Sequence, residues 1–433
     1  MTRCLSACLL VSPLLTACFA AVAADLPDGL AESAISSTAE SESHRWILDS
    51  AGKIYRGTKN ADSGELSWTE FVRVGLDSPV GLVAGKNGSV IVAQRVELTQ
   101  IFDENNDGRG DFFRALISGL PIGSEIAGGP FPGTGGDLLV VFSSAGGATK
   151  NLVSWKPGKG SRGVIELPRT AIAFAISPDR LLAASIRDSG GTWIGTASLG
   201  ASKKEKAPVR AAPVAKPPEV EKAGPPEPAP KPELEPAVRI PIPMFGEHAA
   251  KIEQLNFKDP GTLLAPQNQL TIFLEPCDGR VQGGVILTPE DAGEDKLVIN
   301  HIRLASDGFE IGFSTEIDRL NLPEIKIAAG DTAPGAEMVA VPLKEAVVDP
   351  DGKTITVIPE ALDSGLVYAF DLTGLKRFES DVVLQNPRAA YTVLKIRPTG
   401  ETAPPVREIE TGTETETDDA ADAEKSANEK PEE

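Results

Sequence analysis

The residues best suited to chemistry form an acidic loop, DENNDGRGD, in the first third of the chain. Carboxylate or amide side chains stand at its first, third and fifth positions, and a glycine stands at its sixth. Ca²⁺ takes six to eight oxygen ligands, and alternate side chains converge on one ion only where the chain turns sharply. We therefore predict a calcium site. Its ligands would be Asp103, Asn105, Asp107, the backbone carbonyl of Arg109, and Asp111.

The same loop has a second interpretation. An EF-hand would carry Glu at position 12, where this chain has Arg114, so the loop is closer to the calcium loops found between propeller strands. The alternative is a polar hairpin turn whose Asp and Asn side chains satisfy their own backbone. The sequence leaves both open.

No arrangement typical of a catalytic centre stands out elsewhere. The chain has three histidines, and they form neither a metal-spaced pair nor a Ser-His-Asp order. We predict no catalytic residues, and we expect Cys277 to be a small core residue. Three aspartates near the predicted blade edges could hydrogen-bond a sugar or simply complete turns: Asp77, Asp179 and Asp188.

The elements that must position these residues are strands. Short apolar runs with glycine turns recur, and when aligned on Ile54, Val90, Leu138 and Leu181 they lie 36, 48 and 43 residues apart. Such a period is typical of propeller blades, because one four-stranded sheet cannot bury both its faces. We predict an all-β protein with an N-terminal β-propeller-like domain of four to five blades; a β-solenoid and an open sandwich are the alternatives.

The composition divides the chain into seven segments. We expect a signal peptide at 1–24, a disordered lead-in at 25–43, and the propeller-like domain at 44–199. A Pro-, Ala-, Lys- and Glu-rich stretch at 200–238 is either a linker or an insertion looping out of a blade. Strands that complete or bridge the propeller follow at 239–296, then an immunoglobulin-like β-sandwich at 297–398 and a disordered acidic tail at 399–433.

The N-terminal segment predicts export. Ala21-Val22-Ala23 is a site for ordinary signal cleavage, whereas Leu15-Thr16-Ala17-Cys18 resembles a lipobox that would place a lipid anchor on Cys18. The expected location is the periplasm or cell surface. No later run is long and apolar enough to predict a membrane span.

The charge distribution argues against a nucleic-acid partner. The formal net charge is −20, and residues 401–433 contribute 12 acidic and 3 basic residues to it. No basic stripe is visible that could follow a phosphate backbone.

Several phrases resemble one bacterial envelope family. SPVGLVAGKNGSVIVAQRVELTQIFDENNDGRGDFF is similar to the opening blade of membrane-bound, sorbosone-dehydrogenase-like proteins, and INHIRLASDGFEIGFSTEID is similar to the start of their sandwich. The resemblance implies a propeller followed by an immunoglobulin-like domain, and often a c-type haem domain. Haem attachment needs C-x-x-C-H, but Cys277 is followed by Asp278, so we expect no haem.

These observations favour a non-catalytic exported envelope protein, a binding or scaffolding module that calcium could stabilise. Its partner would be an unidentified envelope protein or a glycan. The alternatives are a glycan-binding module and, from the resemblance, a reduced quinone-dependent sugar dehydrogenase.

Overall fold

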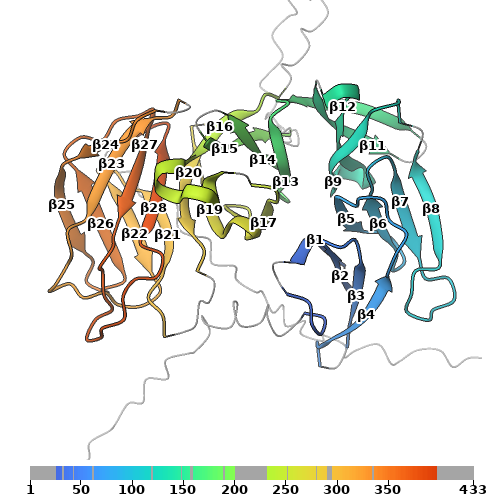
Figure 1. Cartoon of the computed structure of the whole chain (residues 1–433), viewed down its shortest axis with the longest axis horizontal. Helices are drawn as coiled ribbons and strands as arrows, with labels where there is room; N and C mark the ends of the chain where they lie inside the picture. Colours follow the sequence, from blue (N-terminus) through green and yellow to red (C-terminus); the bar gives the residue numbers. More distant parts are fainter. Residues whose placement is uncertain are drawn as a thin grey trace, which may run out of the picture.

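The computed structural model describes residues 26–199 and 232–396, apart from gaps at 32–33, 42, 61–62, 119, 148, 157–158, 189–190, 251, 279, 290–294 and 334–335. The described chain is all-β, as predicted, and its strands form six antiparallel sheets (Figure 1). The expected signal peptide, most of the Pro-rich stretch and the acidic tail lie outside the described residues. Among the helices that are described, none is long and apolar enough to cross a membrane.

Five four-stranded blades make up the first part of the described structure. In each blade, consecutive strands pair in chain order from the innermost to the outermost. The first two blades are β1 Ile35–Glu40, β2 His44–Asp49, β3 Ile54–Lys59 and β4 Leu66–Val72, then β5 Gly81–Ala84, β6 Val90–Ala93, β7 Leu98–Phe102 and β8 Phe112–Ile117. The third is β9 Glu125–Pro132, β10 Leu138–Ser143, β11 Lys150–Lys156 and β12 Gly160–Leu167. The fourth and fifth are β13 Ala171–Ile176, β14 Leu181–Asp188, β15 Gly191–Ser198 and β16 Glu235–Pro241, then β17 Asn256–Asp259, β18 Thr262–Ala265, β19 Leu270–Cys277 and β20 Arg280–Leu287.

Short helices connect some of these strands. They are η2 Thr134–Gly136, η3 Ala145–Gly147, α2 Ile242–Phe245, η4 Gly246–Ala249 and η5 Pro266–Asn268.

Apolar contacts between neighbouring blades hold the propeller together. Separate clusters of buried side chains join the first blade to the second, the second to the third, the third to the fourth and the fourth to the fifth. Glycines let the inner strands approach closely: a Cβ on Gly81 of β5 would clash with the carbonyl oxygen of Gly129 in β9. The prediction of mutually sheltering blades is therefore confirmed.

Two expected segment boundaries are wrong. Strand β1 lies inside the lead-in that we expected to be disordered, and β16 begins at Glu235, within the predicted Pro-rich stretch. The sequence of β1, ISSTAE, is polar because its only neighbour in the sheet is β2 and its other edge lines a central channel. Since β15 pairs with β16, the Pro-rich stretch is an insertion inside a hairpin of the fourth blade and not a linker between domains.

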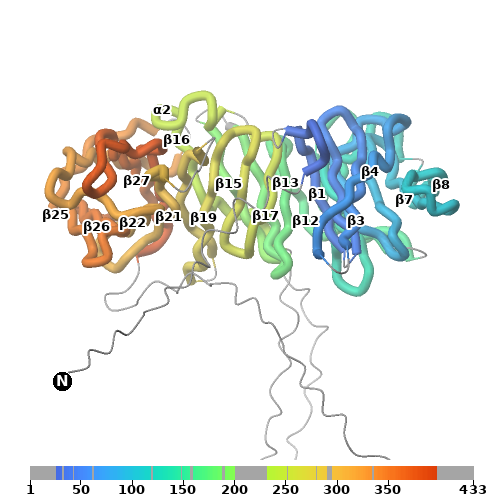
Figure 2. Tube along the Cα trace, turned by 90° about the horizontal axis from the view of Figure 1, so that it is seen from below, coloured from blue at the N-terminus to red at the C-terminus, as the bar shows by residue number. Residues whose placement is uncertain are grey.

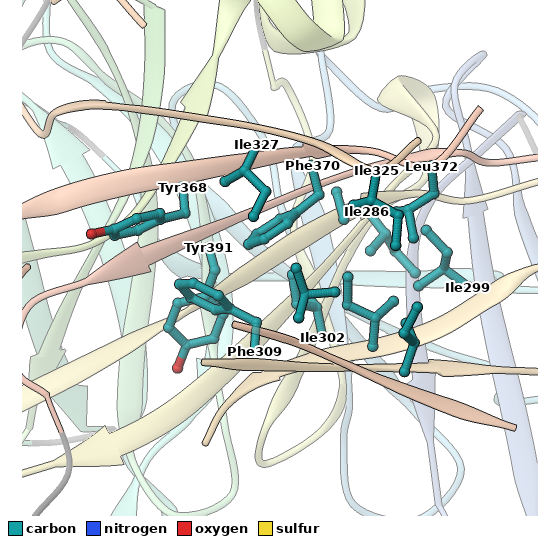
Figure 3. Close-up of a cluster of buried hydrophobic side chains, with 14 of the residues drawn as sticks. Ile286, Ile299, Ile302, Phe309, Ile325, Ile327, Tyr368, Phe370, Leu372 and Tyr391 are labelled. Carbon is teal, nitrogen blue, oxygen red and sulfur yellow. The ribbon is translucent and has the colours of Figure 1, made fainter. Parts of the chain in front are cut away.

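The C-terminal part is a two-sheet sandwich. One sheet has the order β21-β22-β26-β25 and the other contains β28-β27-β23-β24, which corresponds to the strand order of immunoglobulin-like domains. The strands are β21 Ile299–Leu304, β22 Phe309–Phe313, β23 Lys326–Asp331, β24 Val339–Val341, β25 Leu343–Val348, β26 Thr354–Pro359, β27 Leu366–Asp371 and β28 Arg388–Val393. Phe309 lies at the centre of the core, with its ring 4.8 Å from that of Phe370 and 5.0 Å from that of Tyr368 (Figure 3).

The fifth blade and the sandwich share one continuous sheet. Strand β20, the outermost of the blade, pairs antiparallel with β28, so blade and sandwich strands form an eight-stranded sheet (Figure 1). Ile286 of β20 packs into the sandwich core (Figure 3), and Tyr391 donates a hydrogen bond of 2.7 Å to Glu275 of β19. The propeller and the sandwich are thus connected through backbone pairing and a common core.

Tyr368 makes a local hydrogen bond within the sandwich that the sequence did not predict. Its buried hydroxyl accepts a hydrogen bond of 2.7 Å from the backbone N–H of Asp363, five residues upstream. A tyrosine near the start of this strand that bonds back to the preceding corner is a feature of immunoglobulin-like domains.

The substitution Tyr368→Phe should therefore lower the free energy of unfolding by about 1 kcal/mol, because the Asp363 N–H loses its partner while the ring stays packed. Urea unfolding measures this as a lower midpoint with an unchanged slope. An unchanged midpoint would mean that the hydroxyl does not contribute to stability.

Candidate functional site: the central channel

Residues of the innermost strands of the five blades line a cavity of about 730 Å³. Strands β1, β5, β9, β13 and β17 all contribute to its wall, and in Figure 1 they lie on the inner side of the arc of blades. Each of these strands has a sheet neighbour on one side only, so its other edge turns toward the channel. The volume is within the usual range for small-molecule sites.

The channel wall combines small polar groups with aromatic rings. Hydroxyl groups come from β1, and amide side chains come from β17 and the segment preceding it. The aromatic lining residues are Phe131, Phe174 and Phe257. Two carboxylates, Glu40 and Glu253, are the charged groups among the described lining residues, which include no Lys, Arg or His. Such a wall suits an uncharged polar ligand with some apolar surface and disfavours an anion.

One buried acceptor in this wall lacks a partner. The side-chain oxygen Oε1 of Gln254 is shielded from solvent and accepts no hydrogen bond from the described residues. By contrast, Ser37 Oγ accepts a bond of 3.3 Å from the backbone N–H of Leu82, and Glu40 forms an ion pair of 2.7 Å with Lys59. A ligand in the channel would reach this shielded oxygen only after the Gln254 side chain turns toward it, and a donated hydrogen bond would then remove the cost of the unpaired acceptor.

Sequence reasoning missed the channel residues. The only available signal was the run of small polar residues in ISSTAE shortly before the apolar strand HRWILD, which the polar composition of the lead-in obscured. The residues of the fifth blade, including Gln254, carry no motif at all.

None of the three histidines is a lining residue of the channel. His44 lies on β2 with Nδ1 at 2.7 Å from Ser43 Oγ, and burial together with the Arg56 charge lowers its pKa. His248 Nδ1 lies 3.0 Å from the Asn268 carbonyl oxygen. His301 is on β21 in the sandwich, where burial lowers its pKa, with a smaller contribution from Arg303. The channel therefore has no imidazole available as a general base.

The predicted calcium loop connects β7 to β8 at the outside of the second blade. Its carboxylates accept hydrogen bonds from the loop's own backbone: Asp103 from the N–H groups of Asp107 and Gly108, and Asp107 from that of Arg109. Asn105 Oδ1 also accepts from the Asp107 N–H, and Asp111 Oδ1 accepts from the N–H of Glu104. These contacts are those of a polar turn that satisfies its own backbone.

A cationic side chain already occupies one side of this loop. Arg56 of β3 forms an ion pair of 2.9 Å with Asp103, and no group of three or more His, Cys, Asp or Glu side chains suited to a metal occurs in the described part of the chain. In this arrangement a dication at Asp103 would compete with the Arg56 guanidinium for the same carboxylate. Calcium binding by the loop stays a prediction.

That prediction has a direct test. If the loop binds calcium, excess Ca²⁺ should raise the melting temperature by a few degrees relative to chelator, since a ligand of the folded state stabilises it. Asp107→Ala should abolish the difference. Equal melting temperatures for wild type and variant in both conditions would leave only the turn.

Of the three aspartates considered for sugar binding, Asp77 and Asp179 are not among the described lining residues of the channel. Asp77 forms an ion pair of 2.9 Å with Arg95 at the surface. Asp179 lies in the turn between β13 and β14, next to the lining residue Pro178. The side chain of Asp188 is outside the described part.

Comparisons with known proteins place the chain in no sequence family. No family model and no curated protein matches the sequence. Similar solved structures include a PQQ-bound aldose sugar dehydrogenase from Streptomyces coelicolor, 11% identical over 75% of this chain and 94% of that one, with a TM-score of 0.37. A virginiamycin B lyase from Staphylococcus aureus is 13% identical over 76% and 96% of the two chains, with a TM-score of 0.34. A calcium-binding regucalcin from Agrobacterium tumefaciens is 11% identical over 86% and 92%, with a TM-score of 0.31.

These likenesses are too low to carry an argument about ligand, metal or activity. The assignment as a β-propeller-like domain joined to a β-sandwich rests on the strand order and on the apolar clusters between blades.

Proposed function

We propose that this chain is a non-catalytic exported protein of the cell envelope that acts as a binding or scaffolding module. The observation that carries the proposal is the chemistry of the channel wall, which lacks any imidazole or cationic side chain among its described lining residues. A quinone-dependent sugar dehydrogenase needs a base to take a proton from the substrate and cationic groups around an anionic quinone. We therefore expect the resemblance to sorbosone-dehydrogenase-like proteins to extend to architecture and not to activity.

Turnover assays test this proposal. The full chain should reduce no dye with aldoses or alcohols in the presence of pyrroloquinoline quinone and Ca²⁺, and it should not bind the quinone in a titration. Saturable turnover that follows the protein concentration would refute the non-catalytic function and support the dehydrogenase.

A glycan is the ligand class that the channel supports best. Phe131 and Phe257 are half-buried and present apolar surface, while hydroxyl and amide groups, including the unpartnered Gln254 oxygen, can exchange hydrogen bonds with sugar hydroxyls. The lack of cationic lining residues favours neutral sugars over uronates or sulfated sugars.

A glycan array followed by calorimetric titration tests this ligand class. Neutral oligosaccharides should bind, and Gln254→Leu should weaken binding by about tenfold, a typical effect of one lost hydrogen bond at a binding site. Gln385→Leu, an exposed position beyond the lining residues, is the matched control and should bind as wild type does. No binding to any glycan, or equal binding by both variants, would refute the glycan hypothesis. Neither result would contradict the scaffolding function.

A further inference from the structure

Strand β8 leaves an apolar sheet edge uncovered. It is the last strand of the second blade and pairs with β7 alone, so its outer backbone edge has no strand beside it. The first four residues of β8 are exposed, and the side chains of Phe112 and Phe113 are 44% and 45% exposed.

The other outermost blade strands are protected. Strand β20 pairs with β28, and β16 is mostly buried. On β4 the phenyl ring of Phe71 is 2% exposed, and the exposed positions of β12 carry glycine, polar or charged residues. Since exposed sheet edges are templates for strand pairing, proteins usually protect them with charge, bulges or a cover. Strand β8 has one charged residue, Arg114, and a register shift against β7 at Leu98–Thr99, but among the outermost strands of the five described blades it alone carries exposed phenylalanines.

We propose that β8 pairs antiparallel with β8 of a second copy of this chain, around a two-fold axis through Phe113. If the two-fold axis is perpendicular to the sheet, two residues that lie opposite each other point to the same face. Their residue numbers must therefore differ by an even number. With Phe113 opposite itself, Phe112 of each copy faces Arg114 of the other.

This register is complementary. The two Phe113 rings form a cross-strand aromatic pair on one face, and on the other face each Arg114 guanidinium lies against a phenyl ring. Moving the axis one residue along, to Arg114, would oppose two positive charges directly. The alternative centred on Phe112 would place Asp111 opposite Phe113. The charges and rings of β8 thus favour one self-pairing.

The position of β8 leaves space for a second molecule. Strands β7 and β8 lie at the end of the molecule farthest from the sandwich (Figures 1 and 2). Two copies meeting at this edge would extend away from each other. A single short strand pair buries little area, so the dimer should be weak, with a dissociation constant on the order of 100 µM.

Analytical ultracentrifugation of the full chain from about 1 µM to about 500 µM tests the proposal. Wild type should shift from monomer to dimer, and Phe113→Lys, which opposes two charges at the axis, should raise the dissociation constant at least about tenfold. Ile122→Lys is the matched control, because Ile122 is an exposed apolar residue outside β8 and 98% exposed; it should dimerise as wild type does.

A second measurement tests the register. Phe113→Cys should cross-link to its counterpart under mild oxidation in proportion to dimer, whereas Ile122→Cys in the same background should not. A monomer throughout the concentration range, equal effects of the two lysine substitutions, or equal cross-linking of the two cysteine variants would each overturn the proposal. Because neither residue lines the channel, these outcomes are independent of the proposed function.

Discussion

Asp103→Asn should lower the free energy of unfolding by about 3 kcal/mol, although the carboxylate belongs to a loop at the outside of a blade. Asp103 and Arg56 are only 6% and 14% exposed, and their ion pair of 2.9 Å connects the first blade to the second. Arg56 also lies 5.0 Å from the ring centre of Phe71, and its Nε has no partner in the described structure. Removing the negative charge would leave a shielded guanidinium without its counter-ion, which is far more costly than losing a surface pair.

The matched control is Asp77→Asn. Asp77 pairs with Arg95 at the same distance of 2.9 Å, but the two side chains are 50% and 56% exposed. Because solvent screens such a pair, this substitution should change the free energy of unfolding by less than about 1 kcal/mol. Urea unfolding of both variants measures the difference. Equal losses of unfolding free energy would show that the buried Asp103–Arg56 pair contributes no more to stability than the exposed Asp77–Arg95 pair.

Asn386→Ala should lower the free energy of unfolding by a similar amount, about 3 kcal/mol, because it removes hydrogen bonds between strands. Asn386 is 1% exposed; its Oδ1 accepts a bond of 2.7 Å from the Ile299 N–H, and its Nδ2 donates to the carbonyls of Leu287 and Ile299 at 2.8 and 3.2 Å. The side chain therefore connects the end of β20 to β21 directly before β28 begins. Alanine would remove all three of these hydrogen bonds.

Asn321→Ala serves as its control. Asn321 also makes a side-chain hydrogen bond, 2.9 Å to Asp318, but it is exposed, so water can replace the bond. The free energy of unfolding of Asn321→Ala should therefore stay within about 0.5 kcal/mol of the wild-type value. If chemical denaturation shows comparable losses for the two alanine variants, Asn386 does not hold the blade and the sandwich together.

The regular features of the fold could be predicted because they depend on local patterns. Asn87-Gly88, between a short apolar run and the β-branched run that starts at Val90, predicts the β5–β6 hairpin, and the structure places that turn between Ala84 and Val90. The repeat of such hairpins predicts blades, because each sheet needs neighbours to bury its faces.

The misses have a common physical cause, which is pairing between distant segments. Strand β1 looks like a disordered lead-in because its own residues are polar, and only its pairing with β2 and its place at the channel explain it. Likewise, the pairing of β15 with β16 across more than thirty intervening residues cannot be seen in the composition of the Pro-rich stretch. The channel residues depend on five strands converging, and no local motif records that convergence.

The central claim is that the fifth blade and the sandwich are one sheet, so the channel is built on a single connected scaffold. Hydrogen exchange of residues 280–287 and 388–393, read by mass spectrometry, tests it most directly, because the pairing of β20 with β28 makes their protection interdependent. We predict that both segments are strongly protected and that Asn386→Ala accelerates exchange in both by a similar factor. Rapid exchange of residues 283–286 in the wild type, or acceleration confined to residues 388–393 in the variant, would contradict the claim.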